Sequence, residues 1–291
     1  MSTVAVLAHA RKSFGGGLRE LREVLAREGV TDLLWYEVKK SRHVPKRARR
    51  ATAEGADLIF VWVGDGTVQR CLDAVARTAA AVAILPAGTA NLLATSLHVP
   101  DDVAGAVRVG LYGNRRELDT GSVNGEHFAV MAGAGFDSRM SADADRAMKD
   151  RLGRAAYLNT AASNLFARRV MAAVEVDGQP FFEGRASLVL AANVGIILGG
   201  VEVFTAAKPD DGLLELGVVT ARNPVDWART FGRVALRSAE RSPFVEMTRR
   251  RSFRVRFDRK LRYEVDGGVR PAAKDLRIDV HPRSVTVCVP A

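Results

Sequence analysis

The sequence has little cysteine and few aromatic side chains, and both shortages narrow the possibilities. Two cysteines among 291 residues, Cys71 and Cys288, are too few for a disulfide framework or a zinc site, and they favour a reducing compartment. Aromatic residues make up 7%, and none lies in the basic segment 39–50, which argues against a nucleic-acid surface built on base stacking. The opening residues MSTVAVLAHARK become polar too soon for a signal peptide. We therefore expect a cytoplasmic protein without a nucleic-acid partner.

The sequence also lacks a convincing membrane span. Residues 78–97 carry no charge over 20 positions, but Pro86, Gly88 and Asn91 interrupt them. Residues 186–201 are uncharged as well, and an asparagine and three glycines break this stretch. Neither segment is predicted to cross a bilayer, so we expect a soluble protein or one bound at a membrane surface.

Positive charge, in contrast, is abundant. The chain has 43 Lys and Arg against 33 Asp and Glu, a net charge of +10 and an isoelectric point of about 10.1. Two clusters stand out, over residues 39–50 and 249–262. We predict that they contact an anionic membrane, where each basic residue near the surface contributes roughly 1 kcal/mol. The alternative is an ordinary solvated face.

Two short loops follow apolar, β-branched segments that predict buried strands, and each loop leads into a helical segment. The loops are Gly64-Asp65-Gly66-Thr67 and Pro86-Ala87-Gly88-Thr89-Ala90-Asn91. A strand, a glycine turn and a helix together aim backbone N–H groups at a phosphate. The glycines let the backbone approach the anion, the threonines can donate hydroxyl hydrogen bonds, and Asp65 can hold a divalent cation.

Neither loop has the lysine of a Walker A motif or the GxGxxG pattern, so a metal or distant basic residues would have to balance phosphate charge. The alternative is a pair of ordinary strand–helix turns, with Asp65 and Thr67 as caps. Their separation of about 20 residues predicts neighbouring strands of one parallel sheet.

The paired loops resemble the GGDGT and P-x-G-T-x-N motifs of the diacylglycerol kinase catalytic-domain family, which includes soluble bacterial lipid kinases and sphingosine kinases. Val63 stands where the family has its first glycine. The resemblance implies that ATP and Mg²⁺ bind at the two loops. The residues implied in nucleotide binding are Gly64, Asp65, Gly66, Thr67, Gly88, Thr89 and Asn91.

Three further segments fit the same resemblance. Asp119 precedes a predicted hairpin with an Asn124-Gly125 turn, and a Gly-x-Gly-Phe-Asp run follows it at positions 133–137. The segment 208–214 is similar to the family's P-x-x-D-G-x-L pattern. The resemblance implies that Asp65, Asp119 and Asp211 are magnesium ligands, and for Asp211 a plain acidic turn is the alternative.

Asp266 lies where the family has Asp-Gly-Glu, and the resemblance makes it the general base for the substrate hydroxyl. The family glutamate is Gly268 here. The tripeptide Val265-Asp266-Gly267 also occurs as Val176-Asp177-Gly178, where it predicts a hairpin turn, so an ordinary turn is the alternative for Asp266 as well.

The predicted fold is an α/β N-terminal domain with a parallel Rossmann-like sheet over residues 1–122, followed by an antiparallel β-rich, sandwich-like domain over 123–280. A helix is expected over 143–169, and residues 281–291 are expected to form a strand that returns to the first domain. Closely spaced strands without helices between them indicate the antiparallel part.

Together these features predict an ATP-dependent lipid kinase, peripherally bound at the inner face of the membrane, that phosphorylates a hydroxyl of diacylglycerol or a related lipid, with Mg·ATP between the two domains. Two alternatives stay open: an NAD-kinase-like enzyme, which would share the G-G-D-G-T loop, and a degenerate member that binds nucleotide or lipid without turnover. A homodimer is compatible with the sequence, but no motif indicates it.

Overall fold

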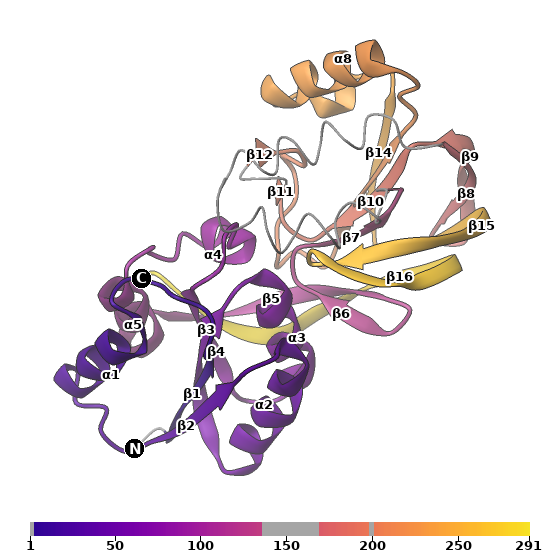
Figure 1. Cartoon of the computed structure of the whole chain (residues 1–291). Coiled ribbons are helices and arrows are strands. Elements are labelled where there is room, and N and C mark those ends of the chain that lie inside the picture. Colours follow the sequence, from indigo (N-terminus) through magenta and orange to yellow (C-terminus); the bar gives the residue numbers. More distant parts are fainter. Residues whose placement is uncertain (1–2, 136–168, 198–200) are drawn as a thin grey trace. The chain divides into compact units, whose positions relative to one another are not determined.

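The computed structural model describes residues 3–135, 169–197 and 201–291 (Figure 1). The chain divides into two compact units: unit 1 comprises Met1–Asp119 and Arg283–Ala291, and unit 2 comprises Thr120–Pro282. Most of the helix predicted over 143–169, and the end of the Gly-x-Gly-Phe-Asp run at 136–137, lie outside the described residues.

Unit 1 contains a parallel sheet of buried, apolar strands. Its strand order is β2-β1-β3-β4, and Thr286 and Val287 of β16 add a further parallel strand beside β4. These elements are β1 (Thr3–His9), β2 (Leu33–Val38), β3 (Ala56–Val63), β4 (Ala81–Pro86) and β16 (Gly268–Val289). Every residue of β4 and all but one of β3 are buried, as expected for a parallel sheet covered on both faces.

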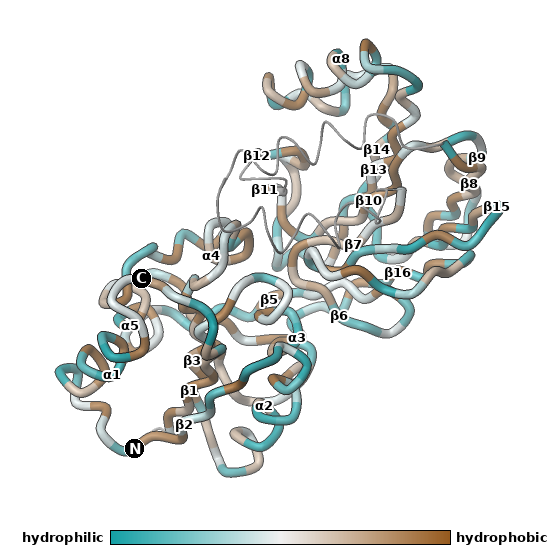
Figure 2. The backbone as a smooth tube through the Cα atoms, in the orientation of Figure 1, coloured by the Kyte–Doolittle hydropathy of each residue, from teal (hydrophilic) through white to brown (hydrophobic). Residues whose placement is uncertain are grey.

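Helices cover the two faces of this sheet. Helices α1 and α5 pack together on one face, and α2 and α3 pack together on the other (Figure 1). Figure 2 shows hydrophobic colour along β1 and β3 and hydrophilic colour along much of α2. The helices are α1 (Gly17–Arg27), η1 (Ser41–His43), α2 (Val44–Ala53), α3 (Asp65–Val75), α4 (Leu92–Ser96) and α5 (Val103–Tyr112). This arrangement confirms the predicted parallel α/β class of the N-terminal part.

Unit 2 is an antiparallel assembly. Its strand order is β14-β13-β10-β7-β15-β16, and β8 pairs with β15 and β9. The strands are β5 (Asn114–Val123), β6 (Glu126–Phe128), β7 (Met131–Ala134), β8 (Val170–Val176), β9 (Gln179–Ala186), β10 (Leu188–Ala192), β11 (Ile196–Ile197), β12 (Val201–Glu202), β13 (Leu214–Val219), β14 (Val245–Arg250) and β15 (Ser252–Val265). Strands β5 and β16 each begin in one unit and end in the other. The predicted antiparallel β-rich class of the C-terminal part is confirmed.

Alternation of side chains builds the core of unit 2. In β15, Phe253, Val255 and Phe257 point into an apolar cluster that also contains Leu216 and Leu276. Among its described residues, unit 2 also has the helical segments α8 (Pro224–Ala235) and η2 (Ala239–Arg241). None of the helices in the described part of the chain is long and apolar enough to cross a membrane.

Candidate active site

The two glycine loops meet at the carboxyl ends of β3 and β4. Val63 pairs with Pro86 at the end of the parallel ladder, so the loops that follow emerge side by side. A Cβ atom built on Gly88 would lie 2.6 Å from the Cα of Gly64, and one built on Gly64 would lie 3.1 Å from the Cα of Gly88. This backbone contact leaves no room for a larger residue at position 88, and little at position 64.

Asn91 shapes the second loop from within. It adopts a left-handed backbone conformation, with φ of 47°, directly before α4. Its Nδ2 donates hydrogen bonds to the carbonyls of Pro86 (2.9 Å) and Gly88 (3.1 Å), and its Oδ1 accepts one from the amide of Gly88 (2.9 Å). Thr89 is exposed at the tip of this loop. Asn91 therefore holds the loop in shape, and Thr89 offers its hydroxyl to solvent.

Asp65 links the first loop to the second. It is the first residue of α3; the residue as a whole is partly exposed, but its carboxyl group is largely enclosed by protein. Burial raises the pKa of Asp65 above its ordinary value, while backbone hydrogen bonds with Leu92, Leu93 and Asn91 act in the opposite direction. A cation beside this carboxylate would offset the desolvation of its charged form. Asp65 thus fits the role of a partial ligand that binds metal together with phosphate oxygens.

Thr67 and Gly66 differ in what they can offer a ligand. The hydroxyl of Thr67 is buried and donates a hydrogen bond to Ser41 Oγ in η1, at 2.8 Å. In this arrangement Thr67 connects α3 to the basic segment. Gly66, in the first turn of α3, is partly exposed.

A glycine-rich turn after β1, residues 10–16, lies beside these loops. Trp62, at the end of β3, donates a hydrogen bond from Nε1 to the carbonyl of Lys12 (3.1 Å), and its ring lies 5.5 Å from that of Phe14. The turn therefore follows β1 into the same region. Strand order reverses between β1 and β3, and ligands of open α/β sheets bind at the carboxyl ends of the strands at this switch point.

Asp119 is fully buried and joins two strands of unit 1. Its Oδ1 accepts a hydrogen bond from the backbone amide of Arg283, at 2.8 Å. It therefore joins the point where β5 leaves this unit to the point where β16 enters it.

Asp211 is engaged by an arginine. Its carboxylate forms an ion pair with the Arg249 guanidinium and accepts a hydrogen bond from the amide of Leu213. Arg249 Nε also lies 3.3 Å from Oε1 of the buried Glu215. Burial raises the pKa of Glu215, Arg249 lowers it, and Asp211 raises it. With Arg249 in this position, the residues around Asp211 do not fit a resident Mg²⁺.

The described residues also contain no group of three or more His, Cys, Asp or Glu side chains that could hold a metal ion. Mg²⁺ commonly binds through one or two carboxylates together with substrate phosphates, and such a site needs no preformed protein cage.

Asp266 is buried at the β15–β16 turn, with φ of 43°. Its carboxylate accepts three backbone hydrogen bonds, from Ala129 (2.8 Å), Val130 (3.0 Å) and Met131 (2.8 Å). Asp177, in the equivalent turn between β8 and β9, is exposed. The two Asp-Gly turns share a backbone shape, but the Asp266 carboxylate is buried among three backbone donors, whereas the exposed Asp177 contacts Ser252 and Arg250.

Gly268 lies beside Arg270. A Cβ atom at position 268 would come within 2.6 Å of Arg270 Nη1, which is the flexible end of a side chain. The guanidinium of Arg270 is itself held by both carboxylate oxygens of Glu126. Arg270 thus borders the position that would carry the family glutamate.

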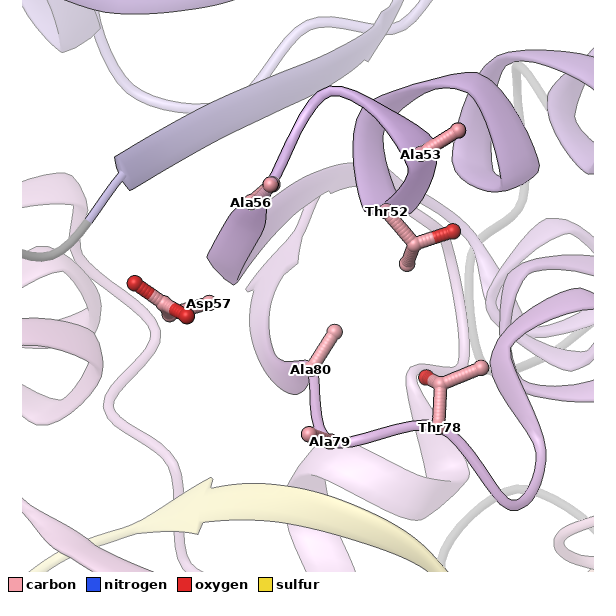
Figure 3. A pocket seen from close by; sticks show the side chains of 8 residues that line it. Thr52, Ala53, Ala56, Asp57, Thr78, Ala79 and Ala80 are labelled. Atoms are coloured by element: carbon pink, nitrogen blue, oxygen red, sulfur yellow. The ribbon is translucent and has the colours of Figure 1, made fainter.

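A pocket of unit 1 lies away from the glycine loops. It is formed by the end of α2, the start of β3 and the residues just before β4 (Figure 3). These are the amino ends of the strands, whereas the loops follow their carboxyl ends. Its one acidic side chain, Asp57, accepts a hydrogen bond from the amide of Thr3. We therefore do not assign the nucleotide to this pocket.

The two basic clusters differ in how their charges are balanced. In the second, four arginines pair with acids: Arg249 with Asp211, Arg250 with Asp177, Arg254 with Asp275, and Arg256 with Glu175. In the first, Arg50 pairs with Glu54, and Arg47 and Arg50 face the ring of Tyr36. Five exposed cations of this cluster form no ion pair with any described residue: Lys39, Lys40, Arg42, Lys46 and Arg49. The second cluster has four such cations, Arg251, Arg259, Lys260 and Arg262, so the first cluster presents the larger uncompensated charge by a small margin.

Comparison with known proteins agrees with this architecture. Residues 8–123 match the family model for the diacylglycerol kinase catalytic domain, and residues 130–289 match that for the YegS C-terminal NAD kinase beta sandwich-like domain. A Pseudomonas aeruginosa protein named "Probable lipid kinase YegS-like" is 31% identical over 289 residues, covering 91% of this chain and 92% of the relative.

Solved structures show the same fold. The crystal structure of a diacylglycerol kinase from Bacillus anthracis superimposes with a TM-score of 0.81 at 24% identity, covering 99% of this chain and 97% of that one. An NAD kinase from Archaeoglobus fulgidus, solved with ATP, reaches a TM-score of 0.55 at 13% identity, covering 99% of this chain and 93% of that one. The two matched domains and the full-length relative together establish that the chain belongs to the diacylglycerol kinase catalytic-domain family, with a YegS-type C-terminal domain.

Proposed function

We propose that this protein is an ATP-dependent lipid kinase that transfers the γ-phosphate of Mg·ATP to a hydroxyl of diacylglycerol or a related lipid at the inner face of the membrane. The observation that carries the proposal is the backbone contact between Gly64 and Gly88 at the carboxyl ends of β3 and β4. It brings two glycine loops together at the edge of a parallel sheet where such folds bind ligands.

The nucleotide is assigned to the loops of unit 1. Backbone groups of Gly64, Gly66 and Gly88 and the exposed hydroxyl of Thr89 are proposed to contact phosphate oxygens. Mg²⁺ bound to ATP would neutralise charge on the phosphate oxygens during transfer. Asp65 is the main proposed protein ligand. Asp119, already bonded to the Arg283 amide, is proposed as a more distant member of the carboxylate network.

Asp266 is proposed to accept the proton of the substrate hydroxyl. A carboxylate offers about four lone-pair positions, and three backbone amides already use its oxygens. These amides fix the orientation of the carboxylate, and orientation contributes much of the catalysis in phosphoryl transfer. The residue therefore has a structural task in addition to the proposed catalytic one.

Membrane contact is assigned first to the basic segment 39–50, because its charges are the less compensated. Charge reversal of Lys39, Lys40, Lys46 and Arg49 should weaken binding to anionic vesicles. Unchanged vesicle binding would remove this segment from the proposal.

The deciding experiment measures transfer of labelled γ-phosphate from Mg·ATP to a panel of hydroxyl lipids in mixed micelles, with Asp65→Asn and Asp266→Asn in parallel. Transfer to one lipid class, lost in both variants, supports the proposal. Phosphate transfer that persists in Asp266→Asn would refute the proposed catalytic role of Asp266 and leave only its structural role.

The same assay separates the two alternatives. Phosphorylation of NAD instead of lipid would favour an NAD-kinase-like activity. The fold of this chain is only distantly similar to that of the Archaeoglobus fulgidus NAD kinase. Binding of Mg·ATP with no transfer to any acceptor would favour a degenerate member, and Gly268→Glu would then be the next variant to measure.

A further inference from the structure

Helix α8 presents an unusual outward face. Val225 is 59% exposed and Leu236, directly after the helix, is 74% exposed, and both are large apolar side chains. At 100° per residue they share one side of the helix with the exposed Ala228 and Gly232. The opposite side carries the buried residues Asp226, Trp227 and Thr230.

The charges on this outward face are all positive. Arg229 and Arg233 on the helix, and Arg222 just before its cap Asn223, are exposed, and none of them forms an ion pair within the described part of the chain. The one acid of the helix, Asp226, is buried and accepts a hydrogen bond from the amide of Arg222. Arg237, beyond the helix, is paired with Glu202. In Figure 2, α8 shows hydrophobic and hydrophilic colours alternating along its length.

The inward face holds the helix in place without help from these outward side chains. Asn223 accepts hydrogen bonds from the amides of Val225 and Asp226, which caps the helix, and the rings of Trp227 and Phe231 stack at 5.4 Å. Thr230 Oγ1 lies 3.2 Å from the hydroxyl of Ser242, just after η2. The outward residues can therefore be replaced while the anchoring contacts stay.

We propose that α8 is an interfacial helix that lies on an anionic bilayer, with Val225 and Leu236 entering the headgroup region and Arg222, Arg229 and Arg233 facing lipid phosphates. Positive charge without an acidic partner, around exposed aliphatic side chains, complements a negatively charged apolar surface. This surface is separate from the basic segment 39–50. The inference rests on the proposed function in one respect only, namely that the substrate is a membrane lipid.

The test measures sedimentation of the full chain with phosphatidylcholine vesicles that contain or lack phosphatidylglycerol. The variant combines Arg229→Gln, Arg233→Gln and Leu236→Gln. Since each arginine near an anionic surface contributes roughly fivefold in affinity, binding to the anionic vesicles should fall by about 25-fold or more. Melting temperature should stay at the parent value, because the anchoring contacts are intact.

A matched control lies in the same unit. Met171 is 40% exposed and pairs across β8 and β9 with the exposed Arg185, so Met171→Gln with Arg185→Gln removes one apolar and one cationic side chain elsewhere, and it is compared with Arg233→Gln plus Leu236→Gln, which remove the same number from α8. This control should bind vesicles like the parent. Equal binding by the α8 variant and the parent would overturn the proposal, and so would equal losses in variant and control.

A second copy of the chain is the competing occupant of this face. Lipid-free sedimentation that shows a dimer, dissociated by Leu236→Gln, would overturn the membrane assignment. Vesicle binding is read without turnover, so a protein that phosphorylates no lipid can still confirm or refute the role of α8.

Discussion

Replacement of Asp266 by Asn tests whether this buried aspartate contributes more to the free energy of unfolding than Asp177, which lies in an exposed turn with the same Val-Asp-Gly sequence. The Asp266 carboxylate accepts three backbone hydrogen bonds in a buried site. The amide of Asn keeps one oxygen and turns an NH₂ group toward backbone N–H donors, so at least one bond becomes a contact between two donors. Hydrogen bonds to charged groups contribute about 1.5–3 kcal/mol each, so we expect a loss of roughly 2–4 kcal/mol in the free energy of unfolding.

The matched control is Asp177→Asn. Asp177 has the same positive φ and the same Val-Asp-Gly context, but its side chain is exposed, and its partners are the amide and hydroxyl of Ser252 and the guanidinium of Arg250. Because water readily replaces such contacts, Asp177→Asn should lower the free energy of unfolding by less than about 1 kcal/mol.

Thermal unfolding monitored by circular dichroism measures both variants. A loss of about 3 kcal/mol corresponds to a drop of roughly 6–12 °C in melting temperature. Similar melting temperatures for Asp266→Asn and Asp177→Asn would refute the structural task of Asp266. Phosphate transfer is then measured well below the lower melting point, so that lost activity reports on chemistry rather than unfolding.

Four further outcomes follow from the described contacts. Gly88→Ala should cost about 1–3 kcal/mol of unfolding free energy and abolish ATP binding by calorimetry, since its Cβ would lie 2.6 Å from Gly64 Cα. Gly232→Ala, in the interior of α8 with open space around it, should instead raise the unfolding free energy by roughly 0.5–1 kcal/mol and leave ATP binding unchanged. Affinity for Mg·ATP should fall with decreasing pH already above the ordinary pKa range of aspartate, because the pKa of Asp65 is raised, and titration of Asp65→Asn should show a flatter profile. In Arg249→Met, the pKa of Glu215 should rise further. Because its folded pKa lies above its unfolded one, the free energy of unfolding should then fall more steeply than in the parent as pH rises from about 4 to 8 in urea unfolding. Gly268→Glu should fold, since the obstructing atom is the end of the Arg270 side chain and not backbone, and this guanidinium can shift within its ion pair with Glu126; a melting temperature more than about 10 °C below the parent would contradict this reading.

The sequence predicts the fold class well, because local patterns specify it. The apolar, β-branched runs of β3 and β4 and the short spacing of their glycine loops indicate adjacent parallel strands, and the strict alternation around Val255 indicates a half-buried strand. The family assignment is confirmed for similar reasons, since the motifs that indicate it are short and contiguous.

The surroundings of the site residues could not be predicted, because they depend on partners far along the chain. The amide of Ala129 is 137 positions from Asp266, and Arg249 is 38 positions from Asp211. Nothing local distinguishes Asp266 from Asp177, or shows that Arg254 and Arg256 are neutralised by Asp275 and Glu175. The catalytic, nucleotide-binding and metal-binding roles of the individual residues stay predictions.

The return of β16 to unit 1 has a consequence for biosynthesis. Residues 283–291 leave the ribosome after all of unit 2, yet Thr286 and Val287 pair with Ala81 and Val82 of β4. Until then the nascent unit 1 exposes an unpaired edge of a buried, apolar strand, and such an edge invites association with other chains. Expression of residues 1–119 alone would make this exposure permanent, so a nucleotide-binding fragment should be produced with residues 283–291 fused after a short linker.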